Sequence, residues 1–113
     1  MIFDISDKTA IITCEGSDTT GPPFLVEIKR NYKYFSSLNI VIDISQMKSV
    51  LSTHIMEFIK LASSHKELND KSFVIVTGSI ALELLPDNLN VVPTLNEALD
   101  TIEIEEIERE LEI

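Results

Sequence analysis

Short apolar runs alternate with polar stretches along the chain, and the spacing of the apolar positions predicts strands and helices in turn. Residues 3–6 alternate between apolar and polar, residues 9–14 form a second β-rich run, and Asp7–Lys8 lie between them as a turn. The two runs therefore predict a hairpin. Three later runs predict further strands, at residues 40–44, 72–77 and 89–92.

The helices are predicted by apolar residues that recur every three or four positions. Such spacing covers residues 24–38, with Pro23 in the first turn, and a second helix from Ser52 to about His65, before a polar connection at residues 66–71. A short helix over residues 80–85 is stopped by Pro86. Thr94 and Glu97 have the spacing of a capping box and predict the start of a final helix.

Strands that alternate with helices indicate right-handed crossovers and a largely parallel sheet, which the hairpin makes mixed. The predicted fold class is α/β, with a mixed, mostly parallel, four- to five-stranded sheet and about four helices. We expect one domain over residues 1–102 and an acidic helix extension or tail over residues 103–113.

The junction between the central strand and the second helix carries the most specific pattern. The strand ends in Asp43-Ile44-Ser45, and Leu51-Ser52-Thr53-His54 follows where the helix begins. Hydroxyl side chains are favoured at helix starts because their oxygens accept hydrogen bonds from the unpaired N–H groups. A phosphate at this position would lie at the positive end of the helix dipole.

This pair of motifs resembles those of STAS domains, the fold of anti-sigma factor antagonists. In that family a strand ends in an Asp-Leu-Ser-like triplet, and Asp-Ser-Ser-Gly opens the second helix some eight residues later. The phrase at residues 92–99, which ends in Glu97-Ala98-Leu99, also resembles the family's closing strand and helix. The resemblance covers residues 2 to about 102 and implies a STAS-like fold.

The resemblance implies a function as a protein-interaction module in a partner-switching pathway that regulates transcription. The partner would be an anti-sigma factor or Ser/Thr kinase of the ATPase-fold type, and phosphorylation of Thr53, or else of Ser52, would release it. Asp43 and Ser45 would shape the site. The partner-binding surface would comprise Gln46, Lys48, Ser49, Val50, Leu51, His54 and Met56.

Two departures from the family pattern leave alternatives open. Leu51 stands in place of the family's acid, and His54 in place of its glycine. Ser52 and Thr53 could be helix caps alone, and His54 could be either an exposed helix residue or a proton-sensitive group. The main alternative function is a constitutive, non-phosphorylated STAS scaffold that self-associates or assembles with other STAS proteins. A weaker one is the sensing of a small ligand at the helix terminus.

Composition narrows the classes of partner. The formal charge of −10 argues against direct binding to nucleic acid, which needs clustered Lys and Arg. No apolar run approaches the roughly 20 residues of a membrane span, and the N-terminus lacks the pattern of a secretory signal. With Cys14 as the single cysteine, we expect a cytoplasmic protein without an internal disulfide.

No combination of residues predicts catalysis, so we expect a protein that is not an enzyme and needs no cofactor. Cys14 has no flanking base to stabilise a thiolate. Asp43 ends a central strand, as receiver aspartates do, but the sequence lacks the late Lys of that site, and local hydrogen bonding is the preferred role. His65 has no Cys or His at ligand spacing, so no metal role is assigned to it.

The C-terminal segment carries a large share of the negative charge. Residues 97–112 hold eight of the 19 acidic residues and a single base, Arg109. Ile104, Ile107 and Leu111 have helical spacing, although Ile102 and Ile104 also alternate as in a strand. The many glutamates favour a helix by propensity, while their mutual repulsion opposes it. Two interpretations of this segment therefore stay open: a solvated tail, or an appended helix that docks on the domain or on a basic partner.

Overall fold

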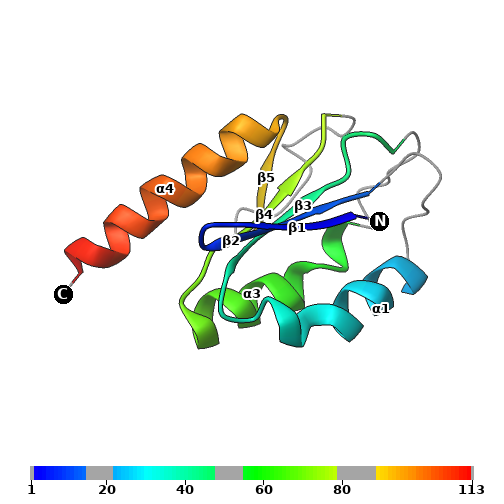
Figure 1. The fold of residues 1–113 in the computed structure, drawn as a ribbon, viewed down its shortest axis with the longest axis horizontal. Helices are drawn as coiled ribbons and strands as arrows, with labels where there is room; N and C mark the ends of the chain where they lie inside the picture. The colour runs from blue at the N-terminus through cyan, green and yellow to red at the C-terminus, as the bar shows by residue number, and fades with distance from the viewer. Residues whose placement is uncertain (1, 15–21, 48–54, 79–88, 113) are drawn as a thin grey trace.

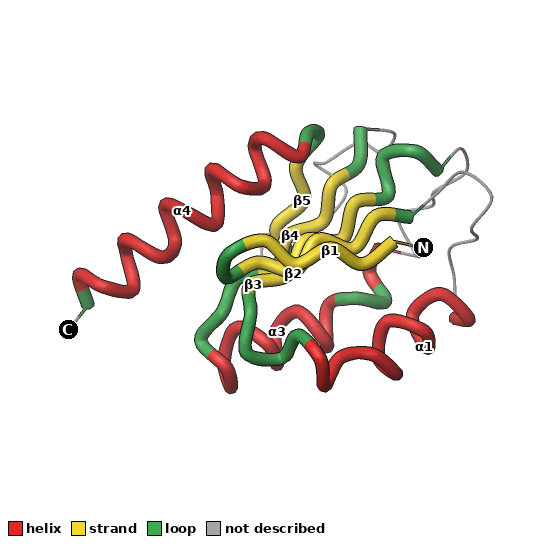
Figure 2. Tube along the Cα trace, viewed as in Figure 1, coloured by secondary structure: helices red, strands yellow, loops and turns green. Residues whose placement is uncertain are grey.

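A five-stranded sheet lies at the centre of the computed structural model, which describes residues 2–14, 22–47, 55–78 and 89–112. The strands lie side by side in chain order, and only the first pair, β1 and β2, is antiparallel. Figure 2 shows the twisted sheet between two layers of helix. The strands are β1 (Ile2–Ser6), β2 (Thr9–Thr13), β3 (Asn39–Asp43), β4 (Phe73–Val76) and β5 (Asn90–Val92).

A two-residue turn joins β1 to β2, as the sequence predicted. Asp7 takes a left-handed conformation with φ of 56°, which short polar side chains tolerate better than most residues do. The register then pairs Ser6 with Thr9 and Ile2 with Thr13. The predicted fold class, a mixed and mostly parallel α/β sheet, is confirmed.

Helices cover both faces of the sheet. Figure 1 shows α1 (Pro22–Asn31) and α3 (Ile59–Asn69) on one face and α4 (Leu95–Leu111) on the other. Successive side chains along a strand point to opposite faces of the sheet. Ile40 and Ile42 therefore join the core beneath α1 and α3, while Val41 packs in the core beneath α4. The central strand is therefore buried on both faces, as its unbroken apolar run predicted.

The first helix is shorter than predicted. The side-chain amide of Asn31 donates to the carbonyl oxygen of Glu27 at 2.9 Å, and the chain continues as a 3-10 turn, η1 (Tyr32–Tyr34). Phe35 is still buried, which maintains the apolar spacing beyond the end of the helix. The predicted extent over residues 24–38 was therefore too long, because the same spacing continues through a tighter turn.

The second helix extends beyond its predicted end. Ile55–Met56 are helical, a turn follows at Glu57–Phe58, and α3 then runs to Asn69. The predicted polar connection at residues 66–71 is thus mostly helix, since Lys, Glu and Leu favour helix even on an exposed surface. Asp70 ends α3 in a left-handed conformation with φ of 53°. The helix predicted over residues 80–85 lies outside the described residues.

Candidate functional site

The candidate site lies at the carboxyl edge of the sheet, where the parallel strands end together. The hydrogen-bond ladder continues one residue beyond the strands: the Cys14 N–H donates to the Asp43 carbonyl, and the Ile44 N–H donates to the Val76 carbonyl, each at 2.9 Å. Ligand sites of open α/β sheets commonly occupy this edge.

A short turn stabilised by a side chain follows β3. One carboxylate oxygen of Asp43 accepts from the Ser45 backbone N–H at 3.0 Å and from the Ser45 hydroxyl at 2.6 Å. The Met47 N–H donates to the Ile44 carbonyl at 3.1 Å, and the side chains of Ile44 and Met47 are buried. Two apolar anchors thus hold the turn to the core, while Ser45 and Gln46 between them face solvent.

The predicted partner surface begins in this turn and extends to the second helix. Gln46 is exposed, Met56 is 44% exposed, and Ile55 beside it is fully buried. Met47 and Ile55 therefore fix both ends of the connection to the core. The candidates Lys48, Ser49, Val50, Leu51, Ser52, Thr53 and His54 lie outside the described residues, so their roles remain predictions.

A buried histidine forms a network that the sequence analysis did not foresee. His65 is fully buried and its Nε2 donates to the Leu38 carbonyl at 2.8 Å, since a carbonyl can only accept. Its Nδ1 then accepts from the Tyr32 hydroxyl at 2.6 Å, and the amide of Asn69 donates to that hydroxyl at 2.7 Å. The network ties η1 and the approach to β3 to α3.

The donor and acceptor roles described for His65 are those of a neutral imidazole. Burial lowers the pKa of His65 below its ordinary value, and the positive charge of Lys71 adds to that lowering, while the Leu38 carbonyl opposes it. Burial likewise raises the pKa of Tyr32, so its hydroxyl keeps the proton that it donates. Both shifts preserve the donors and acceptors of the network at neutral pH, which indicates a structural role.

A second polar cluster, at the amino edge of the sheet, holds α4 in place. The buried Asn39 side chain accepts from the Ser72 N–H at 2.9 Å and donates to Glu106 at 2.5 Å. Glu105 accepts from the Ser72 hydroxyl at 2.5 Å, and Arg109 donates to the same hydroxyl at 3.2 Å. Part of the acidic C-terminal segment is therefore joined to the sheet by specific hydrogen bonds.

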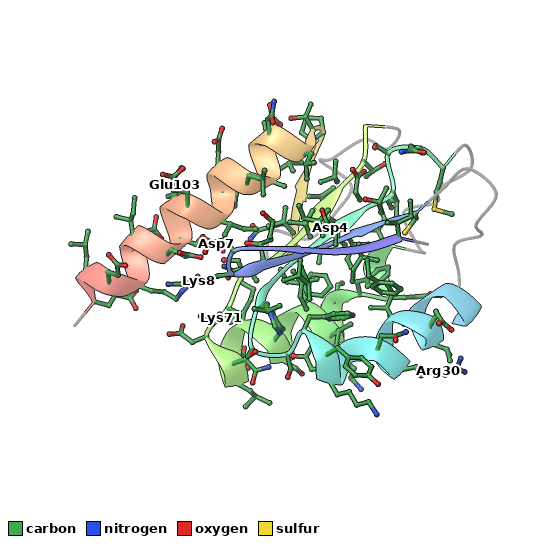
Figure 3. All side chains as sticks on the ribbon, viewed as in Figure 1. Asp4, Asp7, Lys8, Arg30, Lys71 and Glu103 are labelled. Atoms are coloured by element: carbon green, nitrogen blue, oxygen red, sulfur yellow. The ribbon has the colours of Figure 1, made fainter. Side chains whose placement is uncertain are left out.

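The other described residues offer little further chemistry. Across these ranges no group of three or more His, Cys, Asp or Glu side chains is placed to hold a metal ion. A shallow hollow of about 230 Å³ lies between the β1–β2 turn and α4, with Lys8, Lys71, Glu106 and Arg109 among its lining residues. Figure 3 labels Lys8 and Lys71, which lie near the C-terminal half of α4. No helix in the described ranges is both long and apolar enough to cross a membrane.

Comparisons with known proteins agree with the fold. No protein-family model matches the sequence, and no curated protein matches it. A solved structure described as the molecular architecture of the stressosome, a signal integration and transduction hub, contains a chain that is 21% identical over 90% of this chain and 96% of its own. The two superpose with a TM-score of 0.60.

These observations define the architecture first: a mixed α/β sheet with a leading hairpin, covered by helices on both faces. The similarity to the stressosome chain then shows that this fold is STAS-like. The resemblance of the motifs around Asp43 and Thr53 had predicted the same fold.

Proposed function

We propose that the chain is a non-enzymatic STAS-type interaction module of a signalling pathway in the cytoplasm. The observation that carries the proposal is the anchored turn at the carboxyl edge. Buried Ile44 and Met47 hold the turn, Asp43 orders it, and Gln46 is left exposed for a partner. An exposed, well-anchored loop on a rigid sheet is a suitable place for residues that recognise a partner.

Partner switching is the finer form of this proposal. The partner is an anti-sigma factor or Ser/Thr kinase of the ATPase-fold type, which would itself bind ATP. Phosphorylation of Thr53, or else of Ser52, adds close to two negative charges to the predicted helix start. The helix start tolerates that charge, whereas a partner surface packed against it does not. Binding would therefore be lost on phosphorylation and restored on its removal.

A constitutive scaffold is the second candidate function. The observation that favours it is the likeness to a chain of the stressosome, which is described as a signal integration and transduction hub. By analogy, this chain would assemble with other STAS proteins or with itself, without phosphorylation. Leu51 and His54, which replace the acid and glycine of the family pattern, favour this candidate.

Affinity capture from a lysate of the source organism separates the two candidates. The baits are the native chain, Thr53→Asp and the control Ser64→Asp, which adds the same charge at an exposed position on α3. Capture of an ATPase-fold regulator by the native and control baits, but not by Thr53→Asp, supports switching. If all three baits capture the same STAS proteins or copies of the chain, the result supports the scaffold and contradicts partner switching.

A further inference from the structure

The outer side of α4 carries an apolar stripe with acidic borders. Ile104, Ile107 and Leu111 follow helical spacing and are 56%, 51% and 79% exposed. The single base of the segment, Arg109, points the other way and donates to Asn39 and Ser72. We call this surface the acidic face; it consists of Ile104, Ile107 and Leu111 bordered by exposed Glu103, Glu108 and Glu110.

The outer side of α1 and of the η1 turn that follows it has the complementary composition. Val26 is 52% exposed and Tyr34 is 66% exposed, and the Lys33 Nζ lies 5.2 Å from the centre of the Tyr34 ring. Three cations accompany them, and one of these, Arg30, forms only a surface ion pair with Glu27 at 3.0 Å. We call this surface the basic face; it consists of Val26, Lys29, Arg30, Lys33 and Tyr34.

The two faces lie on opposite layers of the molecule and cannot meet within one chain. Figure 3 shows Glu103 on α4 and Arg30 on α1, with the sheet between the two helices. Pairing of two acidic faces would bring like charges together on both borders, which is destabilising. Contact between an acidic face and a basic face buries apolar side chains and pairs opposite charges at once.

We propose that the acidic face of one copy binds the basic face of a second copy. Such a contact is heterologous, because different surfaces of the two copies meet, so it adds copies in series unless the rotation closes a ring. This proposal rests on the second candidate function, the constitutive scaffold, and names the surfaces through which copies of the chain would associate. Neither face includes a residue of the Asp43–Ser45 turn, so the contact does not use that turn.

The net charge of −10 does not forbid this contact. The Debye length is about 8 Å at physiological ionic strength, so repulsion between distant acids is screened and the charges at the contact dominate. The contact is small, with five exposed apolar side chains between the two faces, so its affinity is low and the assembly builds up with concentration.

Charge reversal tests the pairing directly on the purified chain. One variant, E103K/E108K, makes both faces basic, and a second, K29E/K33E, makes both faces acidic. Sedimentation equilibrium measures the weight-average mass of each. We expect the weight-average mass of the native chain to rise with concentration. Either variant alone should associate at least about tenfold more weakly than the native chain. An equimolar mixture of the two variants recovers association, because each then offers the face that the other lacks.

Apolar substitutions test the rest of the contact. Ile107→Gln on the acidic face weakens association, while Leu68→Gln on exposed α3 does not, although Leu68 is 82% exposed. Circular dichroism checks that each variant folds.

Three outcomes overturn the proposal. In the first, the native chain stays monomeric at about 500 µM, where even weak interfaces are populated. In the second, neither charge variant weakens association, and in the third, the two variants remain monomeric when they are mixed. Capture of other STAS proteins from a lysate alongside any of these outcomes would keep the scaffold and reject this contact alone.

Discussion

The buried network around His65 gives the sharpest prediction about stability. Tyr32→Phe removes one hydroxyl and leaves the ring in place, so the change in packing is minimal. The Nδ1 of His65, fully buried, then loses the donor that lies 2.6 Å away. Leaving a buried polar atom without a partner costs about 1–3 kcal/mol. Asn69 is exposed and recovers its lost bond with water, so it adds little.

Thermal unfolding followed by circular dichroism measures this loss. For a chain of this length, 1 kcal/mol corresponds to about 4 °C in Tm, so Tyr32→Phe lowers the Tm by about 4–12 °C. The matched control is Tyr34→Phe, since Tyr34 is 66% exposed and a surface substitution changes stability by about 0.5 kcal/mol at most. Equal losses in the two variants would refute the role given to the network.

The same network predicts how stability depends on pH. The pKa of His65 is lowered on folding, so the unfolded chain binds the proton more readily than the folded one. The stability that His65 contributes is complete above about pH 6.5 and falls as the pH drops from there toward the lowered pKa, by at most about 1.4 kcal/mol per pH unit. A His54→Gln background leaves His65 as the one histidine of the chain.

Denaturant unfolding of that background between pH 7.5 and about pH 5 reads the slope directly. His65→Phe removes the slope over this range, although it also lowers the stability at neutral pH because the Tyr32 hydroxyl and the Leu38 carbonyl lose their partner. A slope that survives in His65→Phe would assign the pH dependence to other groups.

Three further substitutions probe the fold and the candidate site. Asn39→Ala removes the acceptor of the Ser72 N–H in a buried position, and we expect a loss of about 1–3 kcal/mol in the free energy of unfolding, measured with urea. Thr94→Ala removes the helix cap whose hydroxyl accepts from the Glu97 N–H at 3.2 Å, for a loss of about 1 kcal/mol in the same assay. Asp43→Ala costs about 1 kcal/mol or less because its bonds to Ser45 lie at the surface. In the capture experiment, the same variant weakens recovery of the partner.

Periodicity along the chain was sufficient to predict the strands, the opening hairpin and the mostly parallel character of the sheet. The strands are local apolar runs, and the alternation with helices leaves few ways to connect them. Helix ends were less predictable, because they depend on backbone conformations that the apolar spacing does not encode. Asn31 ends α1 by bonding back to Glu27, and Asp70 ends α3 in a left-handed conformation.

The polar networks were not predictable, because their partners are distant in the sequence. His65 bonds to Tyr32 and Leu38, which lie 33 and 27 positions away. Asn39 bonds to Glu106, 67 positions away. A histidine on an otherwise apolar helix face was the available signal for the first network, and it indicates burial without revealing the partners. Asp43 and Ser45 were accessible to sequence reasoning because they are two positions apart.

The two edges of the sheet differ in how their polar groups are held, and this difference determines what their variants can report. At the carboxyl edge, Asp43 bonds within an exposed turn, so its loss is largely compensated by water. At the amino edge, Asn39 and Ser72 are fully buried and water cannot replace their partners. Asp43→Ala should therefore change partner capture at nearly native stability, while Asn39→Ala should lower stability and leave capture unchanged at temperatures where the variant stays folded. The reverse pattern would place the partner surface at the amino edge instead.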